Sequence, residues 1–194
     1  METAGILPSA GQSAWLKRYY VDEFGSPTDI PYATLKNVKA SGTFSNSATN
    51  NSRMYAKFIV DANRLNLELF EYESEFPVSG LISDYAVIKI KDSTGTTSEL
   101  RTRAKFSDSN TKRLVISDAY DVKTVFGALL NSDSVQFRIE VRNTYGSSAS
   151  IYLFSVDARG FGQAYASAFI EDWNQKPEAA GNLLMPLAEY VSSV

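Results

Sequence analysis

The chain contains no histidine and no cysteine among its 194 residues. Histidine is the commonest general base near neutral pH, the cysteine thiolate is a strong nucleophile, and both are the best protein ligands for zinc and copper. Their absence excludes histidine-dependent catalysis, thiol chemistry, disulfide bonds and the usual zinc sites. Chemistry by Asp, Glu, Lys, Tyr or Ser stays open, but these residues fall mostly in turns or at positions expected to face solvent.

The sequence also lacks a strong charge bias and a long apolar run. Its net charge is −3, whereas a surface for duplex nucleic acid needs concentrated lysine and arginine. No stretch is long and apolar enough to span a bilayer, and residues 1–20 lack the positive-then-apolar pattern of a secretion signal. We therefore expect no sequence-specific contact with nucleic acid and no membrane insertion, and a chain that stays where it is made or leaves inside something larger.

Alternation of apolar and polar residues predicts a mainly β protein. In residues 54–60 every second side chain, from Met54 to Val60, is apolar, and leucine recurs at every second position of residues 65–69. Further strands are expected at residues 15–21, 35–44, 85–91, 99–106, 113–116, 135–141 and 151–156. Breaks are expected at residues 25–27 and 29–31. Eight to ten short strands with local turns favour an antiparallel β-sandwich or a partly closed barrel.

One covering helix is expected at about residues 118–131. Ser117 and Asp118 are typical of a helix start. Apolar residues then recur with helical period at Val122, Val125, Phe126, Leu129 and Leu130. A second helical face runs from Phe161 to Trp173, and a helical C-terminal extension follows, kinked at Pro186. The expected organisation is an N-terminal arm (1–14), a β-sandwich domain (15–173) and a C-terminal docking extension (174–194).

Two short motifs resemble catalytic signatures but have simpler explanations. Residues 92–95, Asp-Ser-Thr-Gly, are similar to the Asp-Thr/Ser-Gly of aspartic proteases, with one extra residue between two alternating strands. A hairpin turn accounts for them. Ser109 and Lys112 have the Ser-x-x-Lys spacing of penicillin-recognising enzymes, but that motif needs the first turn of a buried helix and these residues lie in a polar stretch.

Acidic and aromatic residues leave two further alternatives open. Glu71, Glu73 and Glu75 would place three carboxylates on one side of an extended segment. A solvated sheet edge is the favoured interpretation, with a calcium site next and a glycosidase pair last. The aromatic residues could include a sugar-stacking platform, although rings in a β-rich domain mostly fill the core. They are Trp15, Tyr19, Tyr20, Tyr32, Tyr55, Tyr72, Tyr85 and Tyr145.

Several motifs together resemble a known class of protein. They are Val135-x-Phe137-x-Ile139, Tyr152-x-Phe154-x-Val156, Gly160-Phe161, Ala164-Tyr165 and residues 42–49, Gly-Thr-Phe-Ser-Asn-Ser-Ala-Thr. Over residues 35–168 the chain resembles small uncharacterised β-sandwich proteins of gut Bacteroides-type bacteria and their tailed phages, crAss-like phages included. The resemblance carries over no catalytic residue. For the phage members it implies a virion component: a capsid decoration, a neck or collar piece, or a tail part.

We therefore expect a non-enzymatic structural subunit of a phage virion, assembled in the host cytoplasm and needing no cofactor or metal. Its partners would be other virion proteins or copies of itself, contacted through apolar residues of the two terminal arms. These residues are Ile6, Leu7, Leu183, Leu184, Met185, Leu187, Tyr190 and Val191. The arms could instead fold back on their own domain.

A second function class stays open at this point. The chain could be a carbohydrate-binding or adhesion-type β-sandwich module on the surface of a gut bacterium. Such a module needs several tyrosines or tryptophans exposed in a row on one sheet face. A hydrolase, the third class, needs a cleft that holds two close carboxylates.

Overall fold

The computed structural model describes residues 13–36, 39–72, 74–78, 85–101, 104–106, 113–142 and 148–170. Within these residues the chain forms eleven strands and two helices. The strands are β1 (Trp15–Val21), β2 (Pro27–Leu35), β3 (Lys39–Asn46), β4 (Ser52–Asp61), β5 (Arg64–Glu71), β6 (Tyr85–Lys91), β7 (Thr97–Glu99), β8 (Ala104–Phe106), β9 (Leu114–Ile116), β10 (Ser134–Arg142) and β11 (Ser148–Asp157). The helices are α1 (Ala119–Asn131) and α2 (Phe161–Phe169).

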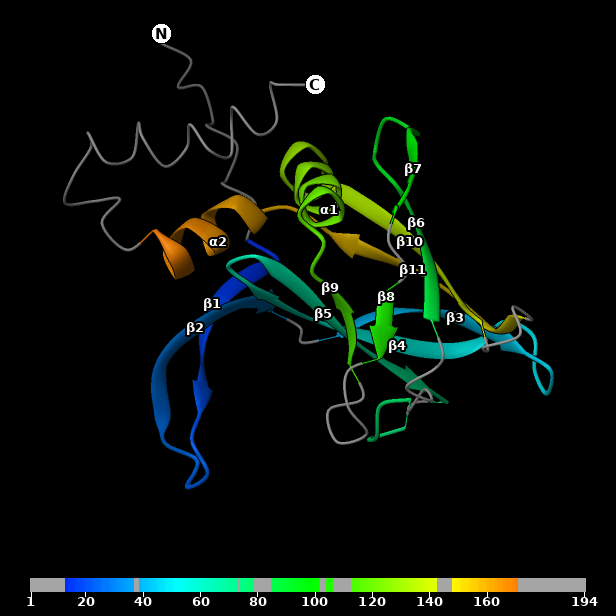
Figure 1. Ribbon diagram of the computed structural model, residues 1–194, viewed down its shortest axis with the longest axis horizontal. Helices are drawn as coiled ribbons and strands as arrows, with labels where there is room; N and C mark the ends of the chain where they lie inside the picture. Colours follow the sequence, from blue (N-terminus) through cyan, green and yellow to red (C-terminus); the bar gives the residue numbers. More distant parts are fainter. Residues whose placement is uncertain are drawn as a thin grey trace, which may run out of the picture.

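All the strand pairs are antiparallel and belong to one curved sheet. Its order is β1-β2-β4-β3-β11-β10-β6-β8-β9-β5, with β7 paired to β6 and β5 paired again to β4. The strands from β4 round to β5 therefore surround a common interior (Figure 1). The ladders on both sides of β8 are only two residue pairs long. The expected mainly β, antiparallel sandwich or partly closed barrel is confirmed, as is the covering helix, whereas the helical extension expected at residues 174–194 lies outside the described residues.

The core fills the space inside this curved sheet. The predicted inward face of β4, from Met54 to Val60, is fully buried, and so are the three leucines of β5. Phe58 lies at its centre and makes edge contacts with Phe137 and Phe154, whose rings stack on each other 5.3 Å apart. Trp15 closes the cluster with its ring centroid 5.9 Å from that of Phe58. The predicted inward faces are therefore buried, but Ile59 of β4 and Asn66, Glu68 and Phe70 of β5 are buried as well on the opposite faces.

The two helices lie together at one end of the barrel (Figure 1). Asp118 caps α1 as expected, because its carboxylate accepts hydrogen bonds from the backbone N–H groups of Tyr120 and Asp121. The predicted apolar stripe of α1 is buried except for Leu130, which is partly exposed. Phe126 joins the helices, since its ring lies 5.5 Å from that of Phe161 and 5.2 Å from that of Tyr165.

Two local expectations were wrong. The expected break at residues 29–31 does not occur, because β2 runs through Pro31, opposite Tyr19 of β1. In the described part of the chain the other side of β2 pairs with β4 at Ala33 and Val60, and not at Pro31. A proline lacks the N–H that a second partner would need, so it is tolerated at such an edge.

The single strand expected at residues 99–106 is instead two short strands on the same edge of β6. Lys89 pairs with Glu99 of β7, whereas Ala86 pairs with Ala104 of β8, so the register shifts by two residues between them. Asp121 of α1, which is fully buried, accepts a hydrogen bond of 2.7 Å from the Arg101 backbone N–H in this gap. The helix therefore supplies the acceptor that a regular ladder would have supplied.

The β1–β2 hairpin projects from the barrel beside α2 (Figure 1). Its base is tied to the body: the Trp15 indole N–H donates to the Asp157 carbonyl over 2.7 Å. Ala14, assigned by sequence to the arm, also bonds here, because its N–H donates to the Arg159 carbonyl and its carbonyl accepts from the Lys36 N–H. Among the described strands, the far half of the hairpin is paired only within itself, β1 with β2.

Candidate functional site

The residues expected to dock with neighbours lie outside the described part of the chain. They are Ile6, Leu7, Leu183, Leu184, Met185, Leu187, Tyr190 and Val191. Ser109, Lys112 and Glu73 also lie outside it. The site must therefore be built from the residues whose positions are described.

The aspartic-protease-like motif is a turn, as expected. The Asp92 carboxylate accepts hydrogen bonds from the Thr94 hydroxyl at 2.7 Å and from the Thr94 and Thr96 backbone N–H groups at 2.9 Å. Gly95 follows with φ of 90°, which favours glycine. The Thr94 hydroxyl, helped by these N–H groups, holds the pKa of Asp92 below its usual value. The carboxylate organises the turn.

The acidic run does not form one extended edge. Strand β5 ends at Glu71, and Tyr72 has a positive φ of 53°. The Glu71 carboxylate accepts a hydrogen bond of 2.8 Å from the Tyr152 hydroxyl, while Glu75 is exposed. Among the described residues no group of three or more Asp or Glu side chains is arranged to hold a metal ion. Glu71 is thus engaged with the neighbouring core tyrosine.

The clearest candidate surface is the projecting half of the β1–β2 hairpin. Large apolar side chains are exposed here, and we name them together the hairpin surface: Tyr19 at 42 %, Val21 at 63 %, Phe24 at 85 % and Ile30 at 62 %. Soluble proteins expose contiguous apolar patches mainly where they bind a partner. The sequence carried one signal of this surface, since Phe24 is a large apolar residue immediately before Gly25 in a predicted break.

The tip that carries Phe24 is a structured turn. The Asp22 carboxylate accepts hydrogen bonds from the backbone N–H groups of Phe24 at 2.9 Å and Ser26 at 2.8 Å. The Asp22 N–H donates to the Ser26 carbonyl at 2.9 Å, and Gly25 takes the φ of 81° that the turn requires. These polar groups of the turn bond to one another, and the ring of Phe24 is left in solvent. Because the backbone of this turn is already ordered, little backbone entropy is lost when the tip binds.

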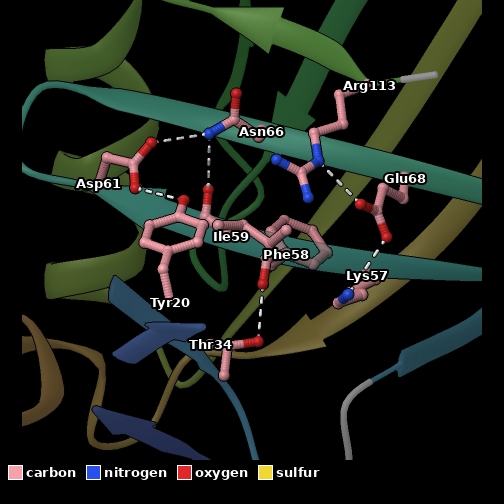
Figure 2. Close-up of polar contacts among 9 residues, drawn as sticks. All are labelled: Tyr20, Thr34, Lys57, Phe58, Ile59, Asp61, Asn66, Glu68 and Arg113. Carbon is pink, nitrogen blue, oxygen red and sulfur yellow. Dashed lines mark hydrogen bonds and ion pairs between the residues drawn. The ribbon is translucent and has the colours of Figure 1, made fainter. Parts of the chain in front are cut away.

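A chain of polar contacts fixes the direction of the hairpin (Figure 2). The Tyr20 hydroxyl donates to the Asp61 carboxylate at 2.8 Å, and the same carboxylate accepts from the Asn66 amide at 2.9 Å. The Thr34 hydroxyl donates to the Phe58 carbonyl at 2.7 Å. Burial, and then the bond to Asp61, raise the pKa of Tyr20 well above its usual value, so its hydroxyl stays a donor. The hairpin is therefore held at a fixed angle to the barrel.

Next to this anchor lies an ion-paired carboxylate on the face of β5 opposite the three leucines. Glu68 alternates with the leucines of β5, and yet it is only 8 % exposed. Its two oxygens contact the Lys57 ammonium at 3.3 Å and the Arg113 guanidinium at 2.8 Å (Figure 2). Both carboxylate oxygens are thus matched by cations, and the group has the geometry of a structural ion pair.

An apolar groove lies between α1, the β4–β5 turn and α2. Its volume is about 270 Å³. Val122, Phe126 and Leu130, one helical turn apart on α1, line it together with Ala62 and Tyr165. The Tyr165 hydroxyl donates to the Ala62 carbonyl at 2.5 Å, which fixes one wall. The groove can accept a small number of apolar side chains.

A polar cleft of about 530 Å³ lies on the outer face of β6 and β10. Its basic side chains face acidic ones: Lys89 contacts Glu99 at 2.9 Å. Arg138 and Arg142 each contact Glu140 at 2.9 Å. Arg101 also lines the cleft, so four cations face two carboxylates and the charge of the lining is net positive.

Comparison of the chain with protein-family models, with curated proteins and with solved structures finds no match. In the described part of the chain, neither helix has the length and apolar character needed to cross a membrane. The hairpin surface and the groove are therefore interpreted from their own geometry.

Proposed function

We propose that this chain is a non-enzymatic structural subunit of a tailed-phage virion that assembles through apolar segments left uncovered by its own β domain. The observation that carries the proposal is the hairpin surface. A turn fixed by Asp22 holds Phe24 almost fully in solvent, and the Tyr20–Asp61 bond fixes the hairpin itself. Ordered hydrogen bonds thus hold an apolar side chain at an exposed tip, which is expected of a docking element.

The gain on docking is large enough to drive association. Full burial of a Phe or Ile side chain contributes about 1.5–3 kcal/mol. Phe24 and Ile30 expose most of their surface, and Tyr19 and Val21 add further exposed area, so covering them gains several kcal/mol at most before the cost of association. A two-stranded ribbon is also only marginally stable alone, and a partner that covers it adds order as well as burial.

The C-terminal segment supplies a second contact in this proposal. Leu183, Leu187 and Tyr190 recur with helical spacing. Residues 171–182 between the end of α2 and this segment can span up to about 40 Å. The apolar groove beside α1 has a lining suited to such side chains, and we place the segment of a neighbouring copy there.

The assignment to a virion rests on the resemblance of residues 35–168 to phage proteins. The rival interpretation, a carbohydrate-binding module, needs exposed rings in a row on one sheet face. Among the described residues the exposed tyrosines come from three places: Tyr19 from β1, Tyr72 from the end of β5 and Tyr120 from α1. This scatter favours assembly over glycan binding.

The test compares the full chain with a hairpin variant that carries Phe24→Ser and Ile30→Thr. We expect the wild-type chain to associate in sedimentation velocity and to be present in purified virions of the phage that encodes it. The variant should keep the thermal midpoint of the wild type but lose association. A chain shortened after Gln175 should fold and also assemble poorly.

A matched control is Leu153→Thr on β11, because Leu153 is a large apolar residue exposed at 45 % outside the hairpin. It should assemble like the wild type. A wild-type chain that stays monomeric at high concentration and is absent from purified particles would overturn the proposal. Clear hits on a glycan array would replace it with the carbohydrate-binding alternative.

A further inference from the structure

Strand β10 places three charged residues side by side in the polar cleft. Arg138, Glu140 and Arg142 alternate with residues that are buried in the core, so all three lie on the outer face of the strand. The Glu140 carboxylate contacts both arginines at 2.9 Å and is itself almost fully buried. One carboxylate therefore holds two guanidinium groups in position, and the two cations exceed it in charge.

Lys89 of β6 adds a like charge directly beside this group. In the ladder between β6 and β10 it is the residue opposite Arg138. Like charges directly opposite each other in a sheet are destabilising. Lys89 also contacts Glu99 of β7 at 2.9 Å, but both side chains are well exposed, and such surface pairs contribute little. An anion that contacted both Lys89 and Arg138 would offset their repulsion.

Arg101 supplies a fourth cation from the gap between β7 and β8. Its backbone N–H donates to the buried Asp121 carboxylate, and its guanidinium carbon lies 3.3 Å from the centroid of the Tyr120 ring. Both contacts come from α1, so the side chain is positioned before any ligand arrives. A guanidinium that stacks on a ring still presents its N–H donors around the edge of its plane.

We propose that the polar cleft binds a compact phosphate group. Four cations face two carboxylates in a volume of about 530 Å³, which has room for a group larger than a single ion. The cations come from β6, β10 and the gap between β7 and β8. A tetrahedral phosphate accepts hydrogen bonds in several directions, whereas a planar carboxylate is matched by one arginine fork. The net charge of −3 on the whole chain opposes a long polyanion and favours a compact one.

Titration calorimetry of the full chain with pyrophosphate, at constant ionic strength, tests the proposal. Arg101→Gln and Lys89→Gln should each raise the dissociation constant about tenfold, because each removes a charged donor. Neither change strands a buried carboxylate, since Glu99 is more than half exposed. Lys91→Gln is the matched control and should have little effect. Lys91 is an exposed cation of the same strand and face, and it does not line the cleft.

Neutralisation of an acidic residue should change the affinity in the opposite direction. Glu99→Gln makes the lining more positive and releases Lys89 from its pair, so the dissociation constant should fall about two- to threefold. A role of these charges in stability alone would not produce tighter binding. A wild-type chain that gives no heat of binding, or an equal loss of affinity in Lys91→Gln, would overturn the proposal. Neither result would bear on the hairpin surface, which shares no residue with the cleft.

Two further probes separate the sources of the phosphate. A short oligothymidylate represents the backbone of a nucleic acid, and succinate represents a dicarboxylate. If the oligonucleotide does not compete with pyrophosphate, the ligand is a small phosphate compound, as we expect. If it binds more tightly and depends on Arg101 and Lys89 in the same way, the cleft is a phosphate site for a nucleic-acid strand and the preference for a compact ligand is wrong. If succinate binds as tightly as pyrophosphate, the cleft selects charge alone and the assignment to phosphate is overturned.

Discussion

The β1–β2 and β4–β5 hairpins belong to the same sheet but lie in opposite environments. In the β4–β5 hairpin, β4 has β3 and β2 on one side and β5 on the other, and β5 also pairs with β9. Its apolar residues are almost all buried, and even Asn66 and Glu68 of its outer face are covered. The β1–β2 hairpin has a partner only near its base and exposes the hairpin surface. Burial therefore follows the number of neighbouring strands more than the apolar content of the strand itself.

The two hairpins should therefore differ in role, with the β4–β5 hairpin stabilising the fold and the β1–β2 hairpin binding a partner. Residues of the β4–β5 hairpin contribute to the free energy of unfolding through close packing. The hairpin surface contributes little to it, since solvent surrounds its side chains in the isolated chain. Variants of the two hairpins should therefore change different measurements.

Phe58→Ala should have the largest effect on stability. Phe58 is fully buried and touches three other rings, so the variant leaves a cavity at the centre of the barrel. We expect the free energy of unfolding to fall by about 3–5 kcal/mol in a denaturant titration. Phe24→Ala removes the same atoms from the hairpin surface and should change it by less than about 0.5 kcal/mol. Equal losses in the two variants would refute the comparison.

The sequence predicted the elements whose two faces differ strongly. The alternation from Met54 to Val60 and the helical stripe from Val122 to Leu129 both face the core, because a period of 2 or 3.6 residues specifies the buried side. The ends of β1 and β6 and the Asp118 cap were also predicted. In each case the information lies within a short window of the chain.

The missed features depend on residues that are distant in sequence. Glu68 is covered because Arg113 reaches it across the β5–β9 pair, and the β7–β8 gap depends on a carboxylate that arrives from α1. The hairpin surface was missed because the pattern of β1 does not say that its outer half has no neighbour. The contact of Tyr20 with Asp61 joins two strands that are distant in sequence, and local periodicity does not predict it.

Asp121→Ala should have the next largest effect on the free energy of unfolding. It acts where the sheet is joined by short ladders, beside β7 and β8. It removes a buried carboxylate and leaves the Arg101 backbone N–H without this acceptor between β7 and β8. A buried polar group without its partner costs about 1–3 kcal/mol. Asp121→Asn keeps an oxygen acceptor and should recover much of the loss. Hydrogen exchange should show faster opening of β7 in the alanine variant, and unchanged exchange there would contradict this role.

The fall of the free energy of unfolding at alkaline pH should also differ between a tyrosine of the barrel, Tyr152, and one of the hairpin, Tyr20. Burial, reinforced by the bond to Glu71, raises the pKa of Tyr152 above its usual value near 10. Above about pH 10 the unfolded chain loses this proton while the folded chain keeps it, so the free energy of unfolding must fall as pH rises.

Tyr152→Phe removes this proton and should make the alkaline fall in stability shallower. At neutral pH it should cost about 1 kcal/mol for the lost hydrogen bond. Tyr20→Phe should change the alkaline slope in the same direction but by less, because Tyr20 is partly exposed. Unfolding titrations at several pH values from 8 to 11 measure both slopes. A wild-type slope that neither variant changes would show that these phenols do not govern alkaline stability.

The smallest effect on stability and the clearest effect on association are expected for Phe24→Ser. The ring makes little contact with its own chain, and the Asp22 turn uses only the backbone of residue 24, so the turn persists when the side chain changes. The thermal midpoint should therefore stay within about 1 °C of the wild type, which corresponds to a few tenths of a kcal/mol. Association should weaken by tenfold or more, because burial of a phenylalanine contributes about 1.5–3 kcal/mol. Gly25→Ala is the informative counterpart: it keeps Phe24 but strains a residue with φ of 81°, and it should weaken association by displacing the ring. If Phe24→Ser unfolds the protein, the tip is part of the folded core. If it leaves association unchanged, the apolar tip is not the contact that joins one copy to its neighbour.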